Sequence, residues 1–196
     1  MSPCRRSQRV GAVADNRAVD LLAERALAIL AMTGARLRFL DAIDCARGFI
    51  LGGGIGEGRV QFQKDGTYQP TDNGVEALLI GCWRDRPGVS ELVDIAAVAI
   101  GGAERWGTRC GRAFALGLST IEIFPGAIVS IHGSPWAWLR TGASGVWILE
   151  PEAPEVGDLL LSFARTRIHA EDIVFGRQLQ QAQLRSLPKI MVPDDK

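Results

Sequence analysis

The chain has 196 residues, of which 47% are hydrophobic and 22% are charged. That length and composition are typical of one globular domain with a sizeable core, and they exclude a chain that is disordered throughout. Lysine and arginine together number 22, as do aspartate and glutamate, so the formal net charge is zero. This balance argues against a protein that coats nucleic acid through a general excess of positive charge, while leaving room for a local basic patch.

The four cysteines, at positions 4, 45, 82 and 110, form no C-x-x-C pair. Scattered cysteines favour reduced, buried thiols in a cytosolic protein over disulfides or a zinc site. Arginines near the start precede a short apolar run, but charged residues return too soon for an export signal. The apolar stretches also fall short of the roughly 18 residues of a membrane span. We therefore expect a cytoplasmic protein without membrane association and without a metal site.

Residues 1–14 are basic and irregular, and we expect them to form a flexible lead-in. From Asp15 onward, apolar residues recur at steps of three and four, which predicts an amphipathic helix. We expect its N-cap to be Asp15 or the asparagine that follows, and its end to be Gly34. A second helical segment is predicted over residues 37–46, with Gly48 ending it.

The middle of the chain has the pattern of β-strands. Phe62 and Tyr68 flank a Lys-Asp-Gly sequence, and a three-residue loop with a left-handed Gly66 would pair the two rings on one face. A two-residue loop would place them on opposite faces, so we favour the longer one. Strands are also predicted over residues 77–83 and 92–100, on either side of a turn that contains proline and glycine. Together these segments predict an antiparallel meander.

After residue 101 the pattern changes to alternating strands and helices. Ser134 is a capping residue directly before Pro135, which suits the first position of a helix, and Gly142 is the expected helix end. Such alternation is typical of a mostly parallel sheet built from right-handed crossover units. The expected order is strand 128–132, a short helix from Pro135, strand 146–149, helix 156–163, strand 166–169, helix 171–184 and strand 189–192.

We therefore predict an α/β or α+β fold in a single domain over residues 1–196. The N-terminal helix and the antiparallel meander occupy residues 15–100, and the alternating strand–helix units occupy residues 101–196. Two glycines at the boundary mark a change in composition, and we expect one core to span both parts.

The glycine-rich run Leu51–Gly58 is the most conspicuous motif. A phosphate-binding loop would need lysine and then serine or threonine after the last glycine, but Arg59 and Val60 stand there. The dinucleotide-binding spacing also fails, so we expect a connector or a tight turn. Thr141–Gly145 lacks the second glycine of a nucleophile elbow, because position 146 is valine. We therefore expect no cofactor.

Three polar residues, His132, Glu150 and His169, lie at or beside the predicted carboxyl ends of strands. Ligands of open α/β sheets bind at this edge, and a His–Glu–His set has the groups needed for acid–base catalysis or metal binding. The alternative is that these strand ends simply meet solvent and that Ser134 is a helix cap.

A small cluster of basic and aromatic residues is the second candidate site, because such clusters contact phosphates and stack on bases. Its arginines could instead pair with the carboxylates of Asp94 or Glu104, and tryptophan is used more often in cores. The cluster consists of Arg105, Trp106, Arg109 and Arg112, with Trp136 as a further ring; Trp136 and Trp138 are two apart on a predicted helix, so we expect one of that pair to be exposed.

Several short motifs recur in the same order in a group of known proteins. With these motifs the chain resembles uncharacterised small proteins of bacterial prophages and plasmids that occur near replication primases. The resemblance covers about residues 75–190 and implies a mobile-element setting without implying an activity. The segments that carry it are Ala77–Gly81, Glu91–Ile95, Arg105–Gly111, Pro135–Gly142 and Gly145–Leu149.

Two functions of different classes follow from these observations. The first is a non-enzymatic accessory protein that binds a protein or nucleic-acid partner through the residue 105–112 cluster and an exposed tryptophan. The second is a small enzyme or nucleotide-binding protein that uses His132, Glu150 and His169. A third possibility is self-assembly through an apolar surface.

Overall fold

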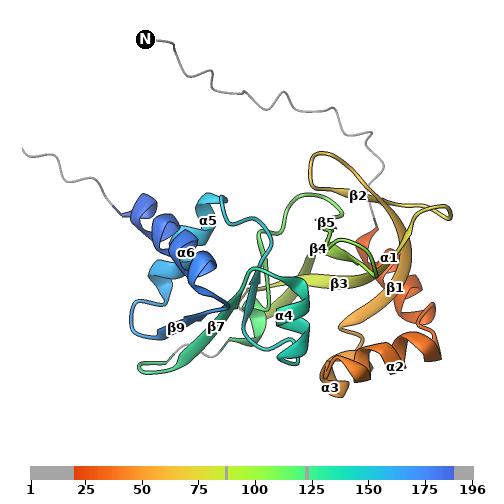
Figure 1. Cartoon of the computed structure of the whole chain (residues 1–196), viewed down its shortest axis with the longest axis horizontal. Helices are drawn as coiled ribbons and strands as arrows, with labels where there is room; N and C mark the ends of the chain where they lie inside the picture. The colour runs from red at the N-terminus through yellow and green to blue at the C-terminus, as the bar shows by residue number, and fades with distance from the viewer. Residues whose placement is uncertain (1–19, 87, 122–123, 188–196) are drawn as a thin grey trace, which may run out of the picture.

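Helices and sheets are both present in the computed structural model, which describes residues 20–86, 88–121 and 124–187. These residues form an antiparallel sheet, a mixed sheet and six α-helices. The predicted mixed fold class is therefore confirmed, with an N-terminal helix that leads into a meander (Figure 1). The predicted lead-in over 1–14 and the predicted strand over 189–192 lie outside the described residues.

The first sheet, sheet A, has the strand order β2-β1-β3-β4-β5, and all its neighbouring strands are antiparallel. The predicted pairing of Phe62 with Tyr68 is confirmed. Gly66 has φ +84° in the connecting loop, as a left-handed glycine at that position requires. The strands are β1 (Ile55–Phe62), β2 (Tyr68–Pro70), β3 (Val75–Arg86), β4 (Val89–Ala99) and β5 (Trp106–Thr108).

Strands β3 and β4 are longer than predicted. Arg84 pairs with Glu91 and Asp85 with Ser90, so residues expected in a turn belong to a two-stranded arm. Polar cross-strand pairs stabilise this arm. Arg84 and Glu91 carry opposite charges, and the Ser90 hydroxyl donates a hydrogen bond to Asp85 at 2.7 Å. A shift in register between Cys82 and Trp83 marks the point where the arm leaves the rest of the sheet.

The helix boundaries before sheet A differ from the predicted ones. Helix α1 (Leu21–Leu30) is capped by Asp20, whose carboxylate accepts a hydrogen bond from the Ala23 amide at 2.9 Å. The N-cap predicted at Asp15 or Asn16 lies outside the described residues. The predicted helix ends at Gly34 and Gly48 are wrong. Gly34 is the first residue of α2 (Gly34–Ala42), directly after the N-cap Thr33. Gly48 lies inside α3 (Arg47–Leu51).

The glycines of the conspicuous run allow close packing of α1 on sheet A. A β-carbon at Gly56 would lie 2.6 Å from the β-carbon of Ala28, and one at Gly58 would lie 2.8 Å from Leu79. Residues 52–54 form the turn between α3 and β1, so the expected connector is confirmed for that part of the run. The remaining glycines belong to β1: Gly56 gives α1 room to approach the strand, and Gly58 makes room for the Leu79 side chain of β3.

The second sheet, sheet B, has the order β6-β8-β7-β9. Strand β7 is parallel to both β8 and β9, while β6 is antiparallel to β8. The predicted cap at Ser134 is confirmed, since its hydroxyl accepts a hydrogen bond from the Ala137 amide. The elements are β6 (Ala115–Leu116), the 3-10 helix η1 (Leu118–Thr120), β7 (Ile128–His132), α4 (Pro135–Arg140), β8 (Val146–Ile148), α5 (Pro154–Ser162), β9 (Arg167–Ala170) and α6 (Ile173–Ser186).

The two faces of sheet B are covered by different helices. Helix α4 packs on the face toward sheet A, where Trp138 and Trp147 join Leu78 and Ile80 of sheet A in one buried cluster. Helices α5 and α6 cover the opposite face, which Ile131 and other residues of β7 and β8 form. The two sheets therefore share a core, and α5 and α6 form the outer layer on sheet B (Figure 1).

Candidate functional site

The structure places the three residues at the predicted strand ends in different environments. His132, at the end of β7, is buried and only 6% exposed, whereas Glu150 and His169 are at the surface. His169 pairs in register with Ser130, two residues before His132. Glu150 lines a cleft beside Trp106 that neither histidine lines. The described structure therefore does not bring the predicted His–Glu–His set together in this cleft.

His132 is a buried, neutral side chain. Neither ring nitrogen has a hydrogen-bond partner of normal geometry among the described residues, although the Ser144 backbone lies near the ring. Burial lowers the pKa of His132 below its usual value of 6.5, and the Glu171 carboxylate and the Ser144 backbone oppose this effect only in part. A neutral imidazole inside the protein contributes to packing rather than to proton transfer with a ligand.

The backbone amides and the serine hydroxyl that follow β7 already donate hydrogen bonds to carboxylates of the protein. The Glu171 carboxylate accepts hydrogen bonds from the amides of Gly133 (2.8 Å) and Ser134 (2.9 Å), and the Ser134 hydroxyl donates to Glu104. In many α/β proteins the same kind of amide binds a phosphate. Glu171 and Glu104 therefore make this edge an unfavourable place for an anion.

Two arginines of the basic cluster contact other parts of sheet A and α1. Arg109 forms an ion pair with Glu24 at 2.9 Å, and the Tyr68 hydroxyl donates to the same carboxylate at 2.8 Å. Arg105 donates to the backbone oxygen of Phe62 at 3.2 Å and lies over its ring, with the guanidinium carbon 4.8 Å from the ring centroid. Both guanidinium groups therefore already make contacts inside the protein.

The two candidate tryptophans are half-buried and pack against other aromatic rings. Trp106 lies edge-on to Trp147, with 6.1 Å between ring centroids, and its indole N–H donates to the backbone oxygen of Leu149. Trp136 lies edge-on to Phe39 at 6.0 Å. Only part of each ring is open to a ligand.

Asp94 is the residue that organises the segment around Arg112. Its fully buried carboxylate accepts hydrogen bonds from the amides of Cys110 (2.9 Å), Arg112 (2.7 Å) and Ala113 (3.2 Å). Asp94 thus binds the backbone of the segment, while the Arg112 side chain is exposed. Of the two carboxylates considered as arginine partners, Glu104 accepts from the Ser134 hydroxyl. The motifs around residues 94 and 110 therefore have a structural explanation.

The cysteines in the described part of the chain are free thiols with little nucleophilic character. Cys45 and Cys82 are buried, and Cys110 is half-buried. Burial raises the pKa of all three, to about 11 for Cys45, where the Asp41 carboxylate adds to the effect. The prediction of buried, reduced thiols fits Cys45 and Cys82, whereas Cys4 lies outside the described residues.

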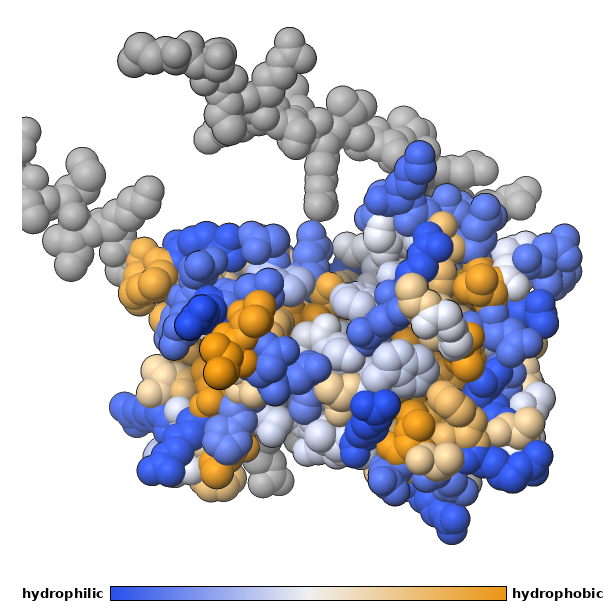
Figure 2. Space-filling view, viewed as in Figure 1, coloured by the Kyte–Doolittle hydropathy of each residue, from blue (hydrophilic) through white to orange (hydrophobic). Residues whose placement is uncertain are grey.

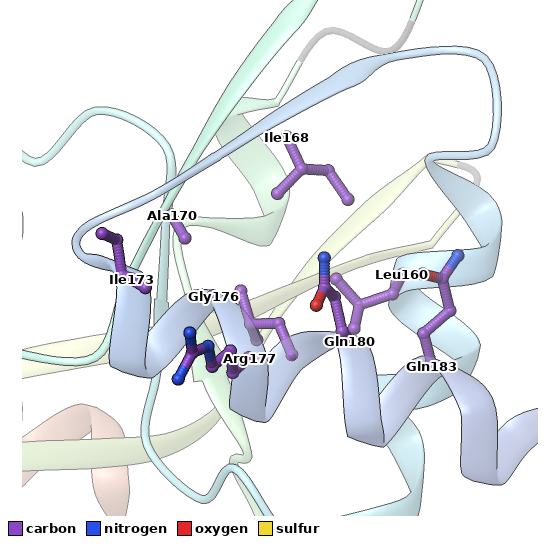
Figure 3. Close-up of a pocket in the computed structure, with 9 residues that line it drawn as sticks. Leu160, Ile168, Ala170, Ile173, Gly176, Arg177, Gln180 and Gln183 are labelled. Carbon is purple, nitrogen blue, oxygen red and sulfur yellow. The ribbon is translucent and has the colours of Figure 1, made fainter.

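A groove of about 460 Å³ lies between β9 and α6 (Figure 3). Ile168 and Ala170 extend from β9 toward α6, and Leu160 of α5 lies at the back. The helix contributes both apolar and polar side chains to the opposite wall. The α6 residues that line the groove are Ile173, Gly176, Arg177, Leu179, Gln180 and Gln183.

Strand β9 is the last strand of sheet B among the described residues, so one of its edges has no neighbouring strand there. The amides of Arg167 and Glu171 donate to the backbone oxygens of Ala127 (2.8 Å) and Ile131 (3.0 Å) on the β7 side. Because alternate residues of a strand direct their backbone groups to opposite sides, the amides of Ile168 and Ala170 face the open edge. The residues with the open backbone groups are thus the ones whose side chains line the groove.

The start of α6 adds exposed apolar surface to the mouth of this groove. Ile173 is 76% exposed and Val174 is 68% exposed. Figure 2 shows hydrophobic side chains at the surface where α6 lies in Figure 1. Sequence reasoning missed this site, although two β-branched residues directly after the helix cap Asp172 were a signal, because a helix start is normally polar.

The described residues contain no group of three histidine, cysteine, aspartate or glutamate side chains arranged to hold a metal ion. None of the helices in residues 20–187 that the structure describes combines the length and apolar composition needed to cross a membrane. No protein-family model, curated protein or solved structure matches the chain. The case for a function therefore depends on the groove and on the surfaces described above.

Proposed function

We propose that this chain is a non-enzymatic binding protein that docks an extended segment of a partner protein in the groove between β9 and α6. The observation that carries the proposal is the combination of open backbone groups and an apolar floor. Ile168 and Ala170 supply both, from the same stretch of β9.

The binding mode is addition of a strand to the edge of sheet B. In such complexes main-chain hydrogen bonds supply affinity, and pockets for alternate side chains supply specificity. The amides of Ile168 and Ala170 would donate to the added strand, and its inward side chains would contact Leu160 and Ile173. Arg177 and the two glutamines of α6 form a polar rim, which is the usual anatomy of a protein-binding site.

A protein partner fits this surface better than a nucleic acid. Arg109 and Arg105 make contacts within the fold, and Trp106 and Trp136 are half-buried. Arg105 and Arg112 are the exposed arginines of the cluster, and the Arg105 guanidinium already contacts the backbone and the ring of Phe62. Phosphate binding relies on several cations at once, so a balanced net charge with these engaged arginines favours an apolar protein segment. The resemblance to prophage and plasmid proteins suggests a cytoplasmic accessory protein of a mobile element.

The proposal is tested with peptides selected on the full chain from a random displayed library. We expect the selected peptides to be extended and apolar at alternate positions. In ¹⁵N-labelled protein, chemical shift changes on titration should concentrate in residues 167–170 and 173–183. Shift changes confined to the surface around Arg112, or a preference for a short oligonucleotide over every peptide, would overturn the proposal.

A second candidate function is nucleotide binding at the end of β8, and one cleft favours it. This cleft of about 250 Å³ brings Trp106, Thr108 and Glu150 together with the loop after β1. A half-buried indole beside backbone glycines suits stacking of a base. Titration with mononucleotides, followed by Trp106 fluorescence, distinguishes this function from peptide docking, because the groove contains no tryptophan.

A further inference from the structure

Two arginines line a pair of adjoining clefts where sheet A meets the start of sheet B. Arg84 belongs to the β3–β4 arm, and Arg112 belongs to the segment that leads into β6. We infer that these clefts form a binding site for a small carboxylate whose apolar part is one ring or a short acyl chain. The site goes beyond the proposed function, because it shares no lining residue with the groove between β9 and α6.

Both of these arginine side chains are exposed to solvent. In the part of the chain that the structure describes, neither guanidinium group forms an ion pair or a hydrogen bond. They differ in this respect from Arg109, which pairs with Glu24, and from Arg105, which donates to Phe62. Because a guanidinium group presents a planar fork of N–H donors that matches the two oxygens of a carboxylate, the clefts contain the groups that such a ligand needs.

A buried charge fixes the backbone that carries Arg112. The Asp94 carboxylate accepts hydrogen bonds from three amides of this segment, those of Cys110, Arg112 and Ala113. Burial of a carboxylate is costly unless several donors satisfy it, so these contacts hold the segment in one position. The Arg112 side chain takes no part in them. A fixed backbone thus presents a cation to the clefts, and such preorganisation lowers the cost of ordering the site when a ligand binds.

A β-bulge lies where the two clefts adjoin. The register between β3 and β4 skips Val93, so this residue is the extra one on its strand. Bulges bend and twist a strand, and they often direct a side chain beside a functional site. Val93 lines both clefts together with Arg84 and Arg112. The bulge therefore supplies a wall that the two clefts share.

The charges around the clefts suit a ligand with one negative charge. The larger cleft, of about 370 Å³, is also lined by Glu91, which lies opposite Arg84 in the arm. Asp85 lines the smaller cleft, but successive side chains of a strand face opposite sides, and its carboxylate accepts from the Ser90 hydroxyl. Two arginines beside one glutamate leave an excess of one positive charge. A carboxylate balances this excess, whereas a phosphate monoester carries more negative charge than the clefts can balance.

The smaller cleft provides apolar surface beside the arginines and has a volume of about 230 Å³. Trp83, Phe114 and Leu118 line it, and all three side chains are half-buried. Sites for drug-sized ligands have volumes of about 300–1,000 Å³, and a cavity of about 150 Å³ holds benzene. The apolar part of the ligand is therefore small.

The test is a titration of the ¹⁵N-labelled full chain with benzoate, which carries one carboxylate on one ring. We expect a Kd of about 1 mM or lower, with chemical shift changes concentrated in residues 83–93 and 112–118. Benzamide is the matched neutral probe, and it should bind about tenfold or more weakly because it lacks the charge. Equal binding of the two probes, or no shift changes with benzoate, would overturn the inference. Inorganic phosphate that binds these residues as tightly as benzoate would also overturn it, in favour of a phosphate site.

Substitutions connect the binding of benzoate to the two arginines. We expect Arg84→Ala and Arg112→Ala each to raise the Kd about fivefold or more, since each removes one of the two cations. Arg38→Ala is the matched control, because this exposed arginine of α2 lines neither cleft, and its Kd should stay within about twofold of wild type. The ¹H–¹⁵N spectra of the free variants check that the fold is retained. Wild-type affinity in either arm of the comparison, Arg84→Ala or Arg112→Ala, would contradict the assignment.

Discussion

The carboxylate of Asp94 on β4 accepts a hydrogen bond from the backbone amide of Arg112 at 2.7 Å. This contact and its neighbours at Cys110 and Ala113 tie the segment that leaves sheet A to the strand that precedes it. Because the segment leads directly into β6, Asp94 sets the path by which the chain enters sheet B.

Replacing Asp94 by alanine is expected to destabilise the protein strongly. The change leaves four backbone amides, those of Ile95, Cys110, Arg112 and Ala113, without this acceptor, and we expect a loss of about 3 kcal/mol or more in the free energy of unfolding, measured by urea denaturation. Arg112→Ala should cost less than about 0.5 kcal/mol, since only its backbone takes part. A larger loss from Arg112→Ala than from Asp94→Ala would contradict the account.

Close packing of α1 on β1 makes Gly56 sensitive to a single methyl group. We expect Gly56→Ala to lower the free energy of unfolding by about 1–3 kcal/mol, because the new β-carbon would lie 2.6 Å from that of Ala28. Gly48→Ala is the matched control: no atom lies within 4 Å of its β-carbon position, so this helical glycine should gain about 0.5–1 kcal/mol. Equal effects of the two changes would show that α1 can move away from the sheet.

Burial of His132 predicts a pH dependence of stability. Its pKa is lower in the folded protein than the usual 6.5, so the unfolded chain takes up the proton first as the pH falls. This histidine should therefore reduce the free energy of unfolding progressively below pH 6.5, until the pH passes its folded-state pKa. Denaturation from pH 7 to pH 5 should show a shallower slope in His132→Asn, with the exposed His169→Asn as control. An unchanged slope in His132→Asn would show that its side chain reaches solvent.

The ion pair between Arg109 and Glu24 predicts a structural rather than a nucleic-acid-binding role for this arginine. A double-mutant cycle with Arg109→Ala and Glu24→Ala should give a coupling of about 1 kcal/mol, because both side chains are largely shielded from solvent. Binding of a short DNA duplex, measured by fluorescence anisotropy, should not change in Arg109→Ala. Salt-sensitive binding that disappears in this variant would instead favour a nucleic-acid partner.

Local signals in the sequence predicted much of the fold. Ser134 before Pro135 identified the start of α4, and the loop around Gly66 identified the first hairpin with its correct register. Glycine was less informative, since Gly34 and Gly48 lie within helices whose caps precede them. Local patterns work where one turn or cap decides the structure.

The candidate sites depend on contacts that no local pattern contains. Arg109 pairs with Glu24, which lies 85 residues earlier in the chain, and Asp94 acts on amides 16 to 19 residues later. The open edge of β9 follows from the order of strands in sheet B rather than from the sequence of β9. The groove between β9 and α6 therefore could not be predicted without knowing the order of the strands in sheet B.

The most direct test of the docking function compares two acidic substitutions on α6. Ile173 lines the groove and is 76% exposed, whereas Leu184 is 66% exposed on the same helix and does not line it. Both variants should keep the stability of the wild-type protein. With a peptide selected on the wild-type chain, we predict that Ile173→Asp weakens binding about tenfold or more and that Leu184→Asp leaves the Kd within about twofold. Equal affinities of the two variants would contradict docking between β9 and α6.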